Sequence, residues 1–451
     1  MKIPSSLMQA KCIFIPNLIK KEQFLWHDNG LSKQRKPREI KTMKNFIRYT
    51  LLLFPIFFFA QTPKTVTPVI PDQGAVASGN YRNILVEAGY SQAEVTAKID
   101  KAWNQLFYGD SKNQRLYYTT RNGAYIKDVN PQNNDVRSEG MSYGMMIAVQ
   151  LNKKKEFDLL WQWAKTYMQH QSGPRKNYFA WQCNDKGKKL DKNSASDGEI
   201  YFATSLYFAA ARWGTGPGIF NYRAEADAIL EAMLSKDSGT DGITNMFNKE
   251  NKQVVFVPYK EAADYTDPSY HLPAFFEIWG KVAAKNNDFW KEAANVSRDF
   301  FIKTANKSTG LMPDYAEFNG KPKAINGHDD FRFDAFRCIM NMAMDYAWFK
   351  GSENEKKLVE KQHKFFQKQG INSYVGLYTI KGKPIGNFRA TGLIATNAVG
   401  ALATDKPIAW KFVNQFMNTS IPSGQYRYYD GMLYMLSLLH LAGEFKAYIP
   451  E

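Results

Sequence analysis

Residues 142–151 read SYGMMIAVQL, a run in which apolar side chains recur at spacings of three and four residues. This spacing puts them on one face of an α-helix and predicts an amphipathic helix. Working outward from this run, the same pattern returns along the chain, with Pro, Gly, Asn and Asp between the repeats. Together these runs predict about twelve helices: Ala93–Leu106, Ser142–Leu151, Phe157–Gln169, Glu199–Arg212, Tyr222–Leu234, Leu272–Ala284, Asp288–Ile302, Ala335–Phe349, Lys356–Lys368, Gly392–Ala401, Ala409–Asn418 and Gly431–Ala442.

Strand-like alternation is scarce, and Gln253–Val257 is the example that predicts a short strand. Nothing between residues 84 and 448 has the composition of a domain linker, so we expect one all-α domain. A closed toroid of six inner and six outer helices uses twelve helices. An open solenoid of helix pairs is the alternative, but the sequence shows no fixed period of the kind that repeats require.

The N-terminal part of the chain predicts an export signal that begins at Met43. Lys44 and Arg48 supply a positive region, and Thr50–Ala60 is a short apolar run that ends in a small residue. A buried strand or helix is the alternative for that run, which is short for a membrane span. Polar residues follow Ala60 directly, and no Cys stands there to carry a lipid anchor.

These features predict four segments. Residues 1–42 are interpreted as an upstream extension or a start assigned too early, and 43–60 as the signal peptide. Residues 61–83, rich in Pro, Thr and Gln, form a lead-in, and 84–451 form the one domain that carries the chemical motifs described below. The mature chain is therefore expected in the periplasm or secreted, without a membrane attachment after cleavage.

Charge and cysteine content narrow the partners. The net charge is +16, and about half of it falls in residues 1–60, so the mature chain is only mildly basic. Such a balance suits polysaccharides decorated with uronic acids, whereas nucleic acid calls for a dense basic stripe. Cys183 and Cys338 remain after the signal, and we expect two free, buried thiols, with a bridge as the alternative.

The first chemical motif is Glu139, with Ser138 before it as the expected N-cap of a helix. Gly140 and Gly144 leave room for another backbone or a substrate. Apolar neighbours raise the pKa of a carboxyl towards that of a general acid, whereas a helix N-terminus and Arg137 favour the ionised form. A Glu that only stabilises the helix start is the alternative.

Two further carboxylates stand out. Asp197 looks like a helix-start residue, and capping alone could account for it. Asp334 and Arg337 are three residues apart and can pair on one helical face, which keeps a carboxylate ionised, as a general base must be. An ordinary surface ion pair is the alternative.

Other chemistries lack their motifs. His328 has Asp329 and Asp330 beside it, but no second His or Cys stands at usable spacing, so no metal site and no cofactor are expected. The sequence contains no Walker loop, no dinucleotide-type glycine fingerprint and no Gly-x-Ser-x-Gly elbow. Carboxylates among abundant aromatic residues favour carbohydrate chemistry, because paired carboxylates cleave glycosidic bonds.

Five motifs, in order, resemble glycoside hydrolase family 8, and within it the xylan-active members. They span nearly all of the mature chain: VRSEGMSYGMM (136–146), SDGEIYFATSL (196–206), DPSYHLPAFFEIW (267–279), FDAFR (333–337) and YRYYDGMLYMLSLLHLAG (426–443). The resemblance implies an (α/α) six-fold barrel with a substrate cleft across one end and an inverting mechanism.

The resemblance also implies roles for individual residues. Glu139 matches the proton donor, Asp334 the base, Asp197 the acid that holds the sugar at the cleavage point, and Arg337 the arginine beside the base. Tyr270 falls near the attacking water. The remaining matches are to substrate-binding positions: Trp181, Arg137, Tyr426 and Tyr429. An inverting pair stands roughly 6.5–9.5 Å apart, which we predict for Glu139 and Asp334.

Two activities compete among the xylan-active members. Those that release xylose from the reducing end carry a Leu-His-Pro element, whereas residues 387–391 here read NFRAT. The missing His favours an endo-1,4-β-xylanase, although Arg389 could still bind a reducing end. Reducing-end release is the alternative, and another β-1,4-glucanase activity is a further one. A non-catalytic carbohydrate binder and a helical scaffold are alternatives of other classes, and a monomer is expected.

Overall fold

The computed structural model describes residues 68–236 and 239–450. The predicted upstream extension and signal peptide lie outside these residues. Among the described residues, helices dominate and every one of the twelve predicted helical runs is found. The α-helices are α1 (Ala75–Ser78), α2 (Ile84–Glu87), α3 (Gln92–Trp103), α4 (Ser138–Gln150), α5 (Lys154–Trp163), α6 (Ser196–Trp213), α7 (Tyr222–Met233), α8 (Pro273–Val282), α9 (Asn287–Thr304), α10 (Phe336–Phe349), α11 (Glu353–Gln369), α12 (Thr391–Val399), α13 (Ala409–Met417) and α14 (Arg427–Leu441).

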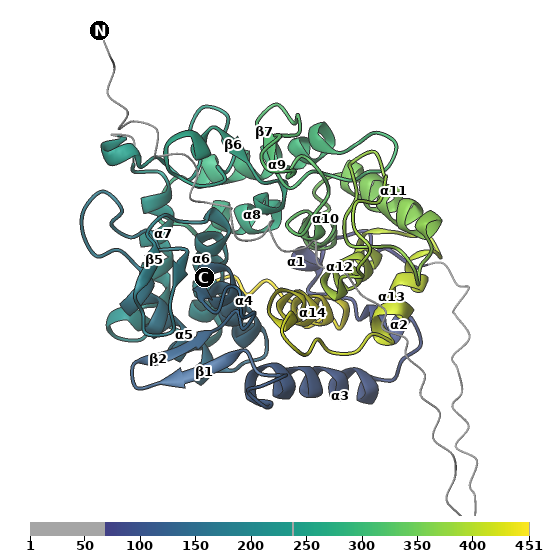
Figure 1. The fold of residues 1–451 in the computed structure, drawn as a ribbon, viewed down its shortest axis with the longest axis horizontal. Coiled ribbons are helices and arrows are strands. Elements are labelled where there is room, and N and C mark those ends of the chain that lie inside the picture. The colour runs from purple at the N-terminus through teal and green to yellow at the C-terminus, as the bar shows by residue number, and fades with distance from the viewer. Residues whose placement is uncertain (1–67, 237–238, 451) are drawn as a thin grey trace, which may run out of the picture. The chain divides into compact units, whose positions relative to one another are not determined.

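Six of these helices form a closed inner ring. In order around the ring, α4, α6, α8, α10, α12 and α14 each contact the next, and α14 contacts α4. Each inner helix also packs against an outer one: α5, α7, α9, α11, α13 and, for α14, α3. Figure 1 shows the inner helices surrounded by the outer ones. The closed ring excludes the open solenoid and matches the toroid that the sequence predicts.

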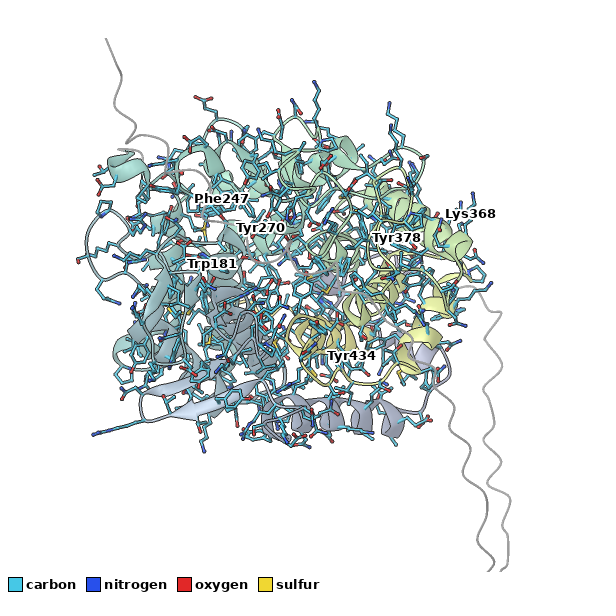
Figure 2. All side chains as sticks on the ribbon, in the orientation of Figure 1. Trp181, Phe247, Tyr270, Lys368, Tyr378 and Tyr434 are labelled. Atoms are coloured by element: carbon cyan, nitrogen blue, oxygen red, sulfur yellow. The ribbon has the colours of Figure 1, made fainter. Side chains whose placement is uncertain are left out.

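Burial follows this arrangement. Nearly every residue of α4 and α6 is buried, whereas the outer helices α3 and α5 bury one side only. Figure 2 shows the contrast, with Tyr434 of the inner helix α14 packed against Phe416 of α13 and Lys368 of α11 at the outer edge of the molecule. Apolar residues on all sides suit a helix surrounded by others, and a single apolar stripe suits one that faces water.

Strands are short and lie in the connecting loops. β1 (Tyr117–Thr120) pairs with β2 (Gly123–Ile126) in antiparallel register, and β6 (Tyr265–Thr266) with β7 (Ala316–Glu317). A three-stranded sheet joins β3 (Val136–Arg137), β4 (Gln182–Cys183) and β5 (Lys189–Asp191).

The strand predicted at Gln253–Val257 is wrong. The segment is buried throughout, and Val254 makes only an isolated bridge to Phe247. Val255 and Phe256 donate to carbonyls of two different segments, at Met246 and Tyr265, so no continuous ladder forms.

Two other features complete the frame. Cys183 and Cys338 are free and buried, as expected. Part of the predicted lead-in is folded, because α1 packs against α10 and the Gly74 backbone lies against the Trp348 carbonyl. Within the described range, no helix is both long and apolar enough to cross a membrane.

Candidate active site

Arg337 binds four carboxylates that come from distant parts of the sequence. Its Nη1 lies 2.8 Å from Asp197 Oδ2 and 3.3 Å from Glu139 Oε2. Its Nη2 lies 2.9 Å from Asp334 Oδ1 and 3.8 Å from Asp267 Oδ2. The guanidinium is 2% exposed, so one buried cation faces four acidic groups. The prediction that Asp334 and Arg337 pair is thereby met, and the pair is not an ordinary surface one.

The inner ring brings these groups together because outer and inner helices alternate along the chain, from α3 to α14. Glu139 lies in the first turn of α4 and Asp197 in the first turn of α6. Asp334 stands in the turn before α10, and Arg337 in its first turn. The N-terminal ends of the inner helices therefore meet at one end of the ring, and their partial positive charges favour acidic side chains there.

Two glycines allow the helices to approach closely enough. A Cβ on Gly140 would lie 2.5 Å from the Tyr428 hydroxyl oxygen, and one on Gly198 would lie 2.6 Å from Ser138 Oγ. This packing also corrects a prediction: Ser138 is the first helical residue rather than the N-cap. Arg137 takes the N-cap position and makes no capping bond through its side chain.

Burial sets the charge state of Glu139. Its side chain is 17% exposed, and burial raises the pKa of Glu139 to about 7, with the Asp197 and Asp334 charges acting in the same direction. Arg337 and Arg137 lower it. The sequence predicts that burial raises the pKa of Glu139 and that Arg137 and the helix N-terminus lower it. Burial has the larger effect, so the carboxyl can hold a proton near neutral pH.

The other carboxylates differ in exposure. Burial raises the pKa of Asp197 and of Asp267, against the lowering effect of Arg337. Asp334 is 27% exposed at its side chain, more than the other three, so water reaches it most readily. The site thus combines a buried carboxyl that holds a proton and a more open carboxylate bound to a cation.

Two tyrosines named by the sequence lie at this cluster. The ring of Tyr270, which is buried, lies 5.5 Å from the guanidinium carbon of Arg337. Tyr429 donates through its hydroxyl to the Phe333 carbonyl at 2.7 Å, next to Asp334. Figure 2 shows Tyr270 within the ring of helices.

Trp181 and Arg137 form a second group beside Glu139. The guanidinium carbon of Arg137 lies 5.6 Å from the Trp181 ring, and its Nε donates to Asp135 at 3.0 Å. The Trp181 carbonyl accepts from the Ser138 amide at 2.9 Å, which ties this group to the start of α4. An aromatic ring beside an arginine and two acids is a surface on which a sugar ring could stack.

Tyr426 is the one predicted site residue that the structure keeps apart from the carboxylates. Its side chain is 64% exposed, and it precedes α14. Its neighbours Gln425 and Arg427 line an open cavity of about 590 Å³, together with Tyr118, Tyr125 and Asn134. Asn134 is followed directly by Asp135, the carboxylate that binds Arg137.

Four residues of the site were not predicted from the sequence: Tyr143, Tyr428, Asp267 and Asp314. Tyr143 accepts from Arg337 Nη1 at 2.7 Å, and Tyr428 donates to Glu139 Oε1 at 3.1 Å. Both tyrosines, like Asp267, lie inside the quoted motifs, so the motifs could have identified them as site residues. Asp314 stands in none of them, and only the fold reveals its position near Asp334.

One cluster offers metal-ligand atoms. Donor atoms of Asp314, His328 and Asp334 lie within 4.8 Å of one another. Asp314 Oδ1 already accepts from the amides of Arg332 and Ala335, and Oδ2 is 2.9 Å from His328 Nδ1. Its oxygens are thus used in hydrogen bonds, and the cluster is better described as an anchor for the loop that carries Asp334.

Comparison with known proteins gives a consistent result. A family model, glycosyl hydrolases family 8, matches residues 76–443. The reducing-end xylose-releasing exo-oligoxylanase Rex8A of Paenibacillus barcinonensis is 41% identical over 386 residues, which cover 84% of this chain and all of the relative. A reducing end xylose-releasing exo-oligoxylanase of Halalkalibacterium halodurans is 40% identical, over 84% of this chain and 97% of the relative.

Solved structures agree with the fold. A family 8 xylobiose complex from Teredinibacter turnerae has a TM-score of 0.81 and 48% identity, covering 84% of this chain and all of that one. The structure of Rex8A with xylose has a TM-score of 0.79 and 41% identity, over 83% of this chain and 100% of that one. The all-α prediction and its six-fold (α/α) barrel are therefore confirmed.

Proposed function

Since the chain belongs to glycoside hydrolase family 8, we propose that it cleaves β-1,4-xylosidic bonds in xylo-oligosaccharides with inversion, releasing xylose from the reducing end. The observation that carries this proposal is that Glu139 and Asp334 both form an ion pair with Arg337. The curated relatives with 35–41% identity are all described as reducing-end xylose-releasing exo-oligoxylanases, which favours this alternative over the endo action first expected.

In the proposed mechanism the two carboxyls take opposite roles. Protonated Glu139 donates its proton to the glycosidic oxygen as the bond to the anomeric carbon breaks. Asp334 removes a proton from a water that attacks that carbon from the other face. The raised pKa of Glu139 supports the acid role, and the greater exposure of Asp334 supports access of the water. The pair's separation of roughly 6.5–9.5 Å stays a prediction.

The supporting residues follow from their contacts. Arg337 pairs with Asp334 and links it to Asp197, which we propose holds the sugar at the cleavage point. Tyr270 faces the same guanidinium and would bound the water site. Trp181, with Arg137 beside it, would stack on a neighbouring xylose ring, and Tyr429 would hold the loop of Asp334.

Endo action is the second candidate, and a specific observation favours it. A xylanase from Teredinibacter turnerae, solved as a catalytic mutant with xylohexaose, is 48% identical to this chain. Residues 387–391 also lack the Leu-His-Pro element, and Arg389 is exposed. The open cavity lined by Tyr118 and Tyr125 offers room for further sugar units.

A time course on xylohexaose and on polymeric xylan separates the candidates. Reducing-end release gives xylose and xylopentaose first, with little attack on the polymer. Endo action gives internal fragments and a rapid fall in polymer viscosity, and that outcome would overturn the exo proposal. Proton NMR of the first-formed anomer tests inversion. Absence of any turnover would support a non-catalytic binder.

We also propose that residues 43–60 direct export and that the mature protein is a monomer outside the cytoplasm. The support is the pattern of Lys44, Arg48 and Thr50–Ala60. N-terminal sequencing of the exported protein should give Gln61 as the first residue. A retained N-terminus would refute the signal peptide, and a dimeric mass in light scattering would refute the monomer.

A further inference from the structure

Asp314 holds the loop that carries Asp334 from both sides. Its Oδ1 accepts hydrogen bonds from the Arg332 amide at 3.1 Å and from the Ala335 amide at 3.0 Å. These amides lie two residues before Asp334 and one residue after it. The Asp314 amide also donates to the Asp330 carbonyl at 3.0 Å, so the two segments are joined through backbone and side chain.

His328 completes this arrangement. Its Nδ1 lies 2.9 Å from Asp314 Oδ2, and its ring stacks on Tyr315 with centroids 4.3 Å apart. The Tyr315 amide in turn donates to the His328 carbonyl at 2.8 Å. Asp314 is completely buried, so a carboxylate here is costly unless its oxygens are bonded, and three donors meet that need.

We propose that Asp314 and His328 are positioning residues that fix the Asp334 carboxylate relative to Arg337. The inference rests on the proposed role of Asp334 as the base. Asp314 sets the backbone on both sides of Asp334, and His328 sets the orientation of Asp314. Neither residue contacts Arg337 in a described hydrogen bond, so their effect passes through the loop.

The geometry gives a definite expectation for catalysis. An inverting base must hold a water in line with the anomeric carbon, and a displacement of about 1 Å costs about 100-fold in rate. Loss of the anchor should therefore lower kcat and leave KM nearly unchanged, because Trp181 and Asp197 lie on other segments. The charge of Asp314 also acts on neighbouring titratable groups: Asp267, Tyr315 and Cys338. The charges of His328 and Asp334 act on Asp314 itself.

The test compares Asp314→Ala and Asp314→Asn. The alanine variant loses both amide contacts, and we expect kcat to fall about 100-fold with KM changed less than about threefold. The asparagine variant keeps a carbonyl oxygen for the amides, so it should recover most of that loss.

His328 is tested in parallel by His328→Ala and His328→Asn, since an Asn amide nitrogen can replace the Nδ1 donor. We expect about a tenfold loss of kcat for alanine and a smaller one for asparagine. Asp345→Asn is the matched control, because Asp345 is equally buried and lies on α10, where it bonds Arg298 of α9 away from the site. It should lower the melting temperature and leave kcat and KM unchanged.

A double-mutant comparison separates positioning from general destabilisation. Measured on an aryl xyloside, Asp314→Ala added to Asp334→Asn should cause little further loss, because the anchor acts through Asp334. Additive losses, or a lowered melting temperature with unchanged kcat, would overturn the inference. If Asp334→Asn alone stayed active, Asp334 would not be the base and the proposed function would fail. The single variant therefore tests the proposed function separately from the anchor.

Discussion

The Tyr428 hydroxyl donates to Glu139 Oε1 at 3.1 Å, while Arg337 binds the other oxygen of the same carboxyl. The carboxyl is thus held between α14 and α10 with its plane fixed. Since both donors favour the ionised form and burial favours the protonated form, the charge of Glu139 depends on a balance of these effects.

Tyr428→Phe tests one side of this balance. The variant removes a donor to the ionised carboxylate, so the alkaline limb of the kcat–pH profile should move to higher pH and kcat should fall several-fold. Steady-state kinetics from pH 5 to 9 measure both effects. Tyr434→Phe is the control on the same helix, because its hydroxyl bonds only the Thr419 carbonyl. An unshifted limb in Tyr428→Phe would contradict the balance.

Gly140→Ala tests the close approach of α4 and α14. The new Cβ would meet the Tyr428 hydroxyl at 2.5 Å, so the ring must move away from Glu139. Overpacking of this kind costs about 1–3 kcal/mol of unfolding free energy. We expect a lower melting temperature and at least a tenfold loss of kcat.

The matched control for that variant is Gly280→Ala in α8, where the Cβ would meet Lys291 Cγ at 2.6 Å and the backbone of Asn287 and Lys291 at 3.3 Å. It should lose stability on the same scale, about 1–3 kcal/mol, but keep wild-type kcat, because no contact of Glu139 is disturbed. Equal kinetic losses in both variants would show that the Tyr428 contact is not the cause.

The helices were predictable because their signal is local. Runs such as Phe157–Gln169 and Asp288–Ile302 repeat apolar residues at helical spacing, and this spacing does not depend on what the helix packs against. The strand predicted at Gln253–Val257 is absent because a loop segment buried on all sides carries the same apolar residues as a buried strand. The pairing partners that would have decided the matter are distant in the sequence.

The site was predictable only where motifs carry it. Glu139, Asp197 and Asp334 stand in quoted motifs, and the structure gathers them around Arg337. Asp314 has no such signal, because its burial and its bonds to the Asp334 loop arise from tertiary packing. The same holds for Ser138: its sequence suits an N-cap, but the contact with Gly198 draws it into the helix.

The raised pKa of Glu139 predicts a pH dependence of activity and stability. Activity should fall as the pH rises through about 7, because the acid then loses its proton.

The same raised pKa affects folding. The contribution of Glu139 to stability is fully present below about pH 4.5, its unfolded pKa, and is lost as the pH rises through about 7. Glu139→Gln cannot ionise, so it should exceed the wild type in stability by roughly 2–3 kcal/mol at pH 8 and by little at pH 4.5. Chemical denaturation at both pH values measures the difference, and an equal difference at both would contradict the assignment.

Leaving-group dependence separates the acid from the base. Glu139→Gln and Asp334→Asn should each lower kcat on xylotriose by at least about 100-fold, the scale of general acid or base catalysis. On an aryl xyloside whose leaving group needs no proton, Glu139→Gln should recover much of its rate, whereas Asp334→Asn should not. Recovery by Asp334→Asn instead would reverse the two roles.

Arg337 is expected to support both chemistry and folding. Arg337→Met leaves four carboxylates without their shared cation, which should cost roughly 3–5 kcal/mol of unfolding free energy at pH 7. The cost should shrink near pH 4.5, because protonated carboxyls no longer repel one another.

Arg337→Lys keeps the charge but cannot bond Asp197 and Asp334 through separate nitrogens, so its kcat should remain far below wild type. Arg298→Met, which removes another buried arginine from Asp345 and Glu277, should destabilise the protein without changing kcat. Melting curves at two pH values with kcat for each variant provide the measurement, and wild-type kcat in Arg337→Lys would show that the fork geometry of Arg337 is not required.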